Sequence, residues 1–139
     1  MKPKFILITS IFMLSGCVAT VTWDGFTPSK SYQITFKDQD ENPVSGVSAS
    51  CSGNGVWPSE KIAQEINEAY KESDPTGLLK LSHSGYEVGG TYNEFGPLTW
   101  GGNEHWKVYC KFIHRGSIIK SGELTEFNQP VEITVPKLI

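Results

Sequence analysis

Trp106-Lys107-Val108-Tyr109-Cys110-Lys111-Phe112-Ile113 is the stretch that decides the fold class of this 139-residue chain. Apolar residues recur at every second position, so one face of an extended strand carries Trp106, Val108, Cys110 and Phe112. Tyr109 and Ile113 make the opposite face partly apolar, which is typical of a strand inside a sheet. Turn residues at 114–117 then predict a hairpin with residues 118–124.

Four further segments are predicted to be strands, either because apolar and polar residues alternate or because a short apolar run lies next to turn residues. They are residues 31–37, 44–51, 78–81 and 131–135. One segment has helical spacing instead: Ser59 can cap a helix that runs to about residue 71. Residues 86–102 are rich in glycine and aromatic side chains and predict a long loop or an irregular hairpin. These elements together predict a mainly β fold, an antiparallel β-sandwich with one short inserted α-helix.

The first 16 residues have the features of an export signal. Lys2 and Lys4 form a short positive region, and an apolar run follows over residues 5–14. That run is too short to span a bilayer, which takes about 20 apolar residues. Leu14-Ser15-Gly16-Cys17 comes next and resembles the lipobox of bacterial lipoproteins. The resemblance implies that residues 1–16 are removed as a lipoprotein signal peptide and that Cys17 is lipidated. An ordinary signal peptide with a chance cysteine is the alternative.

The cysteine count supports this interpretation. The chain has three Cys, and lipidation of Cys17 leaves Cys51 and Cys110 as a pair in an oxidising compartment, where a disulfide forms and persists. Such a disulfide, closing a loop of about 60 residues, stabilises a small domain by roughly 4 kcal/mol in the chain-entropy model. Two buried free thiols are the alternative. We therefore expect a disulfide between Cys51 and Cys110.

Residues 17–30 are polar and contain Pro28, so they predict a lipidated tether before a single β-sandwich domain over residues 31–139. Lipid on Cys17 places the protein in the cell envelope, attached to the lipid bilayer through its acyl chains. In enterobacterial lipoproteins, Asp after the lipidated Cys marks inner-membrane retention. Val18 stands there instead, which favours the outer membrane, with the domain facing the periplasm or the cell surface. We expect no cofactor besides the covalent lipid.

Net charge limits the choice of partners. Removal of residues 1–16 takes away two Lys and no acidic residue, so the formal charge changes from −3 to −5. A mildly acidic domain without a basic cluster is a poor candidate for binding nucleic acid. An envelope protein is therefore the expected macromolecular partner.

Two segments resemble the transthyretin-like and carboxypeptidase regulatory-like domains. Residues 36–38 with Asn42-Pro43-Val44-Ser45-Gly46-Val47 are similar to the first strand, turn and second strand of that family. Thr76-Gly77-Leu78-Leu79-Lys80-Leu81 with Gly85-Tyr86 is similar to a later strand and its Gly-Tyr step. The resemblance implies an Ig-like β-sandwich that serves as a scaffold, an adhesion element or a partner-binding module. The ending Val135-Pro136-Lys137-Leu138-Ile139 lacks the tetrapeptide of the family's hydrolase branch, so no catalytic residue carries over.

The sequence contains no convincing catalytic or metal-binding pattern. Asp38-Gln39-Asp40-Glu41-Asn42 imitates the start of a calcium loop, but Pro43 replaces the required glycine and Ala49 replaces the final Glu. A solvated turn is the preferred interpretation, and a weak calcium site shared with another loop is the alternative. The three His lack the spacing of zinc ligands. We expect no metal, no catalytic residues and no enzymatic activity.

Aromatic residues within the glycine-rich segment 86–102 form the candidate partner-binding surface. Rigid rings can make a contact face for a protein or a sugar, and we select Tyr92, Phe95 and Trp100. Closure of one end of the core by these rings is the alternative, while Trp106 is assigned to the core. The sequence thus favours a non-enzymatic, membrane-anchored envelope lipoprotein that binds another protein. The alternatives are a structural lipoprotein contacting peptidoglycan or an outer-membrane protein, a periplasmic inhibitor or immunity protein, and an enzyme acting on envelope polymers.

Overall fold

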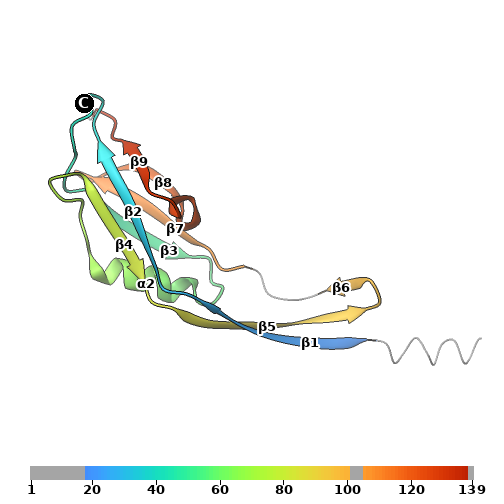
Figure 1. Cartoon of the computed structure of the whole chain (residues 1–139). Coiled ribbons are helices and arrows are strands. Elements are labelled where there is room, and N and C mark those ends of the chain that lie inside the picture. Colours follow the sequence, from blue (N-terminus) through green and yellow to red (C-terminus); the bar gives the residue numbers. More distant parts are fainter. Residues whose placement is uncertain (1–17, 101–104, 138–139) are drawn as a thin grey trace, which may run out of the picture. The chain divides into compact units, whose positions relative to one another are not determined.

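The computed structural model of the chain describes residues 18–100 and 105–137 (Figure 1). The predicted signal peptide and the lipidation of Cys17 lie outside the described residues. The chain divides into two compact units, of which the larger comprises Phe26–Tyr86 and His105–Ile139. No helix within residues 18–100 and 105–137 is long and apolar enough to cross a membrane.

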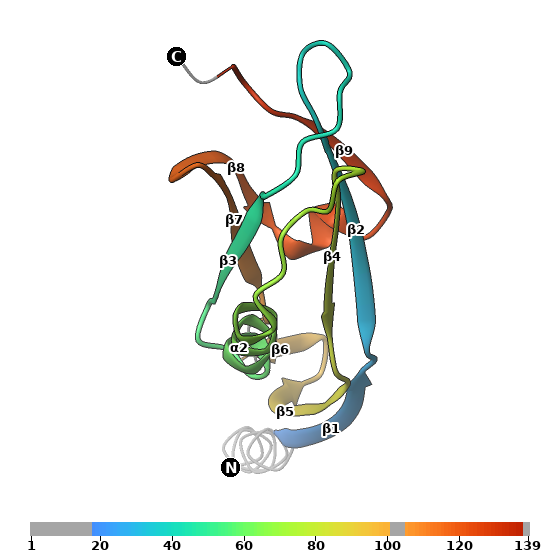
Figure 2. The same cartoon turned by 90° about the vertical axis from the view of Figure 1, so that its left-hand side faces the viewer.

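The larger unit is a β-sandwich with one α-helix among its described residues, in agreement with the predicted mainly β class. The strands of its first sheet, in the order β4-β2-β9, are β4 (Leu78–His83), β2 (Lys30–Lys37) and β9 (Val131–Thr134). The strands of its second sheet, in the order β3-β7-β8, are β3 (Ser48–Gly53), β7 (Val108–His114) and β8 (Ser117–Glu123). Figure 2 shows the two sheets facing each other, with α2 (Ser59–Ala69) beside β3 and β4.

One strand pairing differs from the predicted antiparallel arrangement. β2 pairs antiparallel with β4 but parallel with β9, so the first sheet is mixed. The reason is the connection to β9: after the predicted β7–β8 hairpin, the chain forms the short 3-10 helix η1 (Leu124–Phe127) and crosses to the other sheet. A crossover of this kind is required for parallel pairing, because a tight hairpin produces only antiparallel neighbours.

The core consists of the strand faces that alternation predicts. In β2 the side chains of Tyr32, Ile34 and Phe36 are buried, and in β7 those of Val108, Cys110 and Phe112 are buried. The Phe36 and Phe112 rings meet with centroids 5.5 Å apart, and the Phe127 ring of η1 packs edge-on against Phe112 at 5.2 Å. Aromatic contacts therefore connect β2 of the first sheet with β7 of the second sheet, and connect β7 with η1.

The start and end of α2 differ from the prediction. Pro58 is the N-cap residue, and Ser59 is the first helical residue, whose buried Oγ has no hydrogen-bond partner in the described part of the chain. The predicted Ser59 cap is therefore wrong, because the Pro58 carbonyl accepts the first helical hydrogen bond, from the Ile62 N–H, which makes Pro58 the N-cap residue. The helix ends at Ala69, and Tyr70 takes the left-handed conformation with φ of 37°.

Cys51 and Cys110 are joined by a disulfide, as the cysteine count predicts. They lie opposite each other in the register of β3 and β7, and both are buried. The Asn67 side chain of α2 holds Cys51 from the other side, since its amide accepts the Cys51 N–H and donates to the Cys51 carbonyl, both at 2.8 Å. An edge strand is thus secured covalently on one side and by a helix on the other.

The smaller unit is a sheet with the strand order β1-β5-β6, formed by β1 (Ala19–Thr27), β5 (Tyr86–Phe95) and β6 (Leu98–Trp100). We call its described residues, 18–25 and 87–100, the ribbon. None of residues 18–25 and 87–99 is buried. The predicted tether therefore contains a strand. Of the two predictions for residues 86–102, the antiparallel pair of β5 and β6 agrees with the hairpin and not with the long loop. The pairing of β1 with β5 explains the strand in the tether, because it satisfies backbone groups that a local pattern cannot assign.

Candidate functional site

An exposed group of aromatic side chains lies in the larger unit, where β4 leads into β5. The Trp57 ring, just before α2, is 56% exposed and meets the Tyr86 ring edge-on with centroids 5.7 Å apart. Phe26 is 62% exposed and lies directly over Gly85, where a Cβ would collide with the Phe26 ring. We call Phe26, Trp57 and Tyr86 the aromatic cluster. The cluster needs glycine at position 85, because any other residue would displace one of its rings.

Glu65 of α2 fixes the chain at this point. One oxygen of its carboxylate accepts a hydrogen bond from the Tyr86 hydroxyl, and the other accepts the Ser84 N–H at 2.7 Å. Burial acts to raise the pKa of Glu65, but the hydrogen bonds from Tyr86 and Ser84 outweigh it and lower the pKa. The same hydrogen bond to Glu65 raises the pKa of Tyr86 to about 12. Tyr86 is thus a neutral donor held by a charged acceptor, which makes the contact strong.

A buried polar pair lies next to this contact. The His83 ring is buried, with Nδ1 2.8 Å from the Ser84 carbonyl oxygen and Nε2 3.2 Å from the Tyr32 hydroxyl. Because a carbonyl oxygen only accepts, Nδ1 carries a proton and donates it to the Ser84 carbonyl. Burial raises the pKa of Tyr32 to about 12. Trp106, half-buried against the core as predicted, meets the His83 ring edge-on at 6.3 Å.

These contacts suit the cluster to binding. Each carboxylate oxygen of Glu65 and each ring nitrogen of His83 already has a hydrogen-bond partner, so these groups hold Ser84 and Tyr86 in place, and Trp57 packs against the Tyr86 ring. What the site presents to solvent is aromatic surface, chiefly the Trp57 and Phe26 rings. A ring that is already fixed loses little conformational freedom when a partner covers it.

The predicted contact residues Tyr92, Phe95 and Trp100 lie in the ribbon and are not members of the aromatic cluster. Tyr92 and Phe95 are three residues apart on β5, so their side chains point to opposite faces. Trp100 lies on β6 at the register position opposite Asn93. Tyr92 and Phe95 therefore do not share one surface, and the part of all three residues in partner binding stays a prediction.

The aromatic cluster could not be selected from the sequence. Trp57 stands in a glycine-rich turn and Tyr86 follows a strand, and nothing in their local patterns connects them. Their contact depends on how α2 packs against β4, which places Glu65 beside Tyr86. The signals available were a Trp before Pro58 and the Gly85-Tyr86 step.

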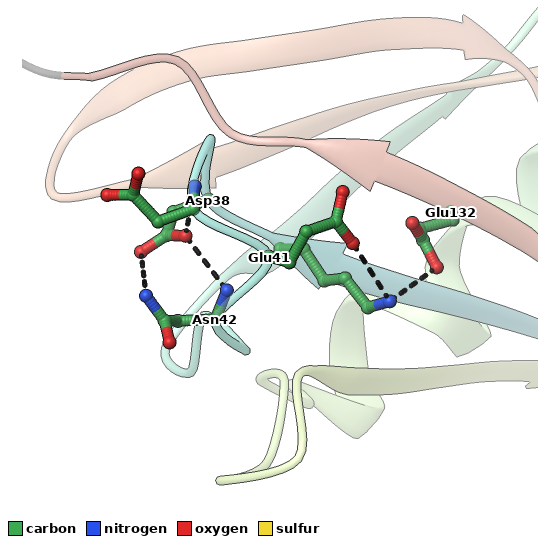
Figure 3. Close-up of polar contacts among 6 residues, drawn as sticks. Asp38, Glu41, Asn42 and Glu132 are labelled. Atoms are coloured by element: carbon green, nitrogen blue, oxygen red, sulfur yellow. Dashed lines mark hydrogen bonds and ion pairs between the residues drawn. The ribbon is translucent and has the colours of Figure 1, made fainter.

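The acidic turn after β2 is a self-contained structural feature (Figure 3). The Asp38 carboxylate accepts the backbone N–H groups of Asn42 and Asp40, both at 2.9 Å, and the Asn42 side-chain amide at 3.3 Å. These hydrogen bonds, that from the Asn42 backbone first, lower the pKa of Asp38. Within residues 18–100 and 105–137, no group of three or more His, Cys, Asp or Glu could hold a metal ion. The geometry supports a solvated turn.

Lys37, the last residue of β2, is ion-paired beside this turn. Its Nζ lies 3.4 Å from a carboxylate oxygen of Glu41 and 3.0 Å from one of Glu132 on β9. Figure 3 labels these two acidic residues. The hydrogen bond and charge of Glu132 contribute most to raising the pKa of Lys37. A polar depression of about 430 Å³ adjoins the turn, and Arg115 and Lys137 are among its lining residues. Its mixture of acidic and basic groups does not favour a ligand of either charge.

Comparison of the chain with protein-family models, with curated proteins and with solved structures finds no match. The resemblances to bacterial lipoproteins and to transthyretin-like domains therefore rest on the quoted residues alone.

Proposed function

We propose that the protein is a lipid-anchored module of the cell envelope, in the outer membrane, that binds another protein through the aromatic cluster. The lipobox-like residues before and including Cys17 support the anchor. The exposure of the Trp57 and Phe26 rings, on a foundation fixed by hydrogen bonds, is the observation that carries the binding function.

Tryptophan and tyrosine contribute more binding free energy at protein interfaces than most residues do. Covering the exposed half of an indole removes on the order of 100 Å² of apolar surface from water, which contributes about 2–3 kcal/mol. Because Trp57 packs against Tyr86, and Tyr86 is held by Glu65, most of that free energy is available for association. A single well-placed ring therefore accounts for a large part of the affinity of a standard interface.

The test is capture of partners from detergent-solubilised envelopes by the immobilised lipidated protein. The variants are Trp57→Ala and Phe26→Ala, with Ile118→Ala as the matched control. Ile118 is 59% exposed in the β7–β8 hairpin. The turn of that hairpin lines the depression beside Asp38, which directly follows the last residue of β2. His83 pairs with Lys30 at the other end of β2. The control therefore removes a comparable apolar side chain at the far end of the sandwich.

We expect the wild type and Ile118→Ala to retain one discrete protein, which then binds the purified wild type directly. Trp57→Ala should weaken that binding about tenfold or more, equivalent to about 1.4 kcal/mol or more. Equal binding by all variants would contradict the assigned surface. Recovery of cell-wall material in place of a protein would favour the structural lipoprotein that contacts peptidoglycan. Unchanged circular dichroism spectra check that each variant is folded.

The anchor has a separate test in intact-mass spectrometry of the membrane-extracted protein. A mass that begins at Cys17 and includes lipid is expected. An unlipidated mass would refute the anchor, whatever the outcome of the capture experiment.

A further inference from the structure

The ribbon is amphipathic. Along β1, one face carries Ala19, Val21 and Trp23, and the other carries Thr20, Thr22 and Asp24. This alternation is the pattern of a strand with one apolar and one polar side.

Contacts with β5 extend both faces. A Cβ at Gly25 would lie 3.4 Å from the Val88 side chain and 3.6 Å from the Trp23 ring, so Val88 and Trp23 share a face. The Thr20 hydroxyl donates to the Asn93 side chain at 3.0 Å, which places Asn93 on the polar side. Tyr92 and Glu94 are both an even number of residues from Val88 and therefore lie on the Trp23 side, where the Glu94 carboxylate accepts a hydrogen bond from the Tyr92 hydroxyl. We call Val21, Trp23, Val88 and Tyr92 the apolar face, and Glu94 lies beside it next to Tyr92.

The apolar face is not buried within the described part of the ribbon. Trp23 is 41% exposed, and Val21, Val88 and Tyr92 are only half-buried. A few strands without a buried side chain have little stability of their own, so contact with a further apolar surface would stabilise the ribbon considerably.

The position of the ribbon in the chain identifies that surface. β1 begins two residues after Cys17, and Trp23 is six residues after it. A fully extended chain spans at most about 3.6 Å per residue, so Trp23 lies within about 22 Å of the lipidated residue. This step rests on the proposed anchor. Tryptophan and tyrosine are the residues preferred at a membrane–water interface, because their rings are apolar with one polar group.

We infer that the apolar face is a second membrane contact, which lies in the interfacial layer of the bilayer beside the lipid anchor. Residues 18–29 and 86–100 contain no Lys or Arg, and their acidic residues are Asp24, Glu87 and Glu94. The attraction is therefore apolar rather than electrostatic, and neutral lipid suffices for it.

The test uses the lipidated protein in neutral phosphatidylcholine vesicles, with and without bromine on the upper acyl carbons. Brominated lipid quenches tryptophan that reaches the interfacial layer. We expect quenching in the wild type, and loss of most of the quenched component in Trp23→Phe. Val21→Glu, which puts a carboxylate next to Trp23 on the same face of β1, should abolish the Trp23 component. Thr22→Glu, its neighbour on the polar face, should leave that component unchanged. Exchange of part of the phosphatidylcholine for phosphatidylglycerol should not increase the quenching.

Flotation of the vesicles separates failure of this inference from failure of the anchor. If the wild type floats with the vesicles but brominated lipid quenches no Trp23 component, the membrane contact is overturned and the anchor stands. If the wild type does not float, the anchor is refuted and this inference falls with it. If Val21→Glu keeps its quenching but loses the protein partner, the apolar face is a protein surface, which also overturns the inference.

Discussion

Removal of the disulfide should lower the stability of the sandwich by about 4 kcal/mol. The perturbation is the double substitution Cys51→Ala and Cys110→Ala. The two cysteines are 59 residues apart, and the chain-entropy model gives about 4 kcal/mol for a loop of that length. For a domain of this size, such a loss corresponds to a fall in melting temperature of roughly 15–20 °C. The variant should still fold, because the Asn67 amide continues to bind the backbone of residue 51.

Thermal unfolding followed by circular dichroism measures this change, and unfolding in urea checks it independently. The urea m-value should rise in the variant, because an unfolded chain without the crosslink exposes more surface. The control is the unfolded wild type treated with a thiol reagent before and after reduction, and Cys51 and Cys110 should react only after reduction because the disulfide leaves neither of them a free thiol. A fall of less than about 5 °C in the variant would refute the reasoning, since the crosslink would then not restrict the unfolded chain.

Two further substitutions test local features. Gly77→Ala should cost more stability than Gly46→Ala, although both glycines have positive φ: a Cβ at Gly77 would collide with the Phe36 carbonyl oxygen, whereas nothing lies within 4 Å at Gly46. Denaturant unfolding should give about 1–2 kcal/mol for Gly46→Ala and a larger loss for Gly77→Ala, and equal losses in the two folded variants would contradict the collision. Glu65→Gln should lower the pKa of Tyr86 from about 12 toward 10, as seen in an ultraviolet titration, and an unchanged pKa would count against the contact. Because the folded-state pKa of Glu65 lies below its ordinary value of 4.5, its stabilisation is present above that pH and is lost as the pH falls. The melting temperature of the wild type should therefore drop more steeply in acid than that of Glu65→Gln.

Local patterns in the sequence predict the interior of the sandwich well. Alternation in residues 31–37 places Tyr32, Ile34 and Phe36 together, and all three are buried. Such patterns work because a strand with one side in the core must repeat with a period of two. The cysteine pair is predicted for a different reason, since the odd count leaves one plausible intramolecular pairing once Cys17 is lipidated.

The parts that the sequence does not predict depend on partners that are distant in the chain. β1 alternates in polarity, but its strand character becomes clear only through its pairing with β5, about 70 residues later. The parallel pairing of β9 with β2 depends on the path of η1 across the sandwich. The contact between Trp57 and Tyr86 likewise requires α2 to be in place. The aromatic cluster is thus a product of tertiary packing rather than of a motif.

The bond between Cys51 and Cys110 also closes a covalent ring that contains α2, β4 and the β5–β6 hairpin. A protease that cuts the exposed hairpin would therefore produce two fragments that remain one molecule until the disulfide is reduced. Within that molecule, the N-terminal fragment carries β2 and β3 and the C-terminal fragment carries β7, β8 and β9. A cut in this hairpin would consequently leave both halves of the sandwich joined to the segment that carries the proposed lipid.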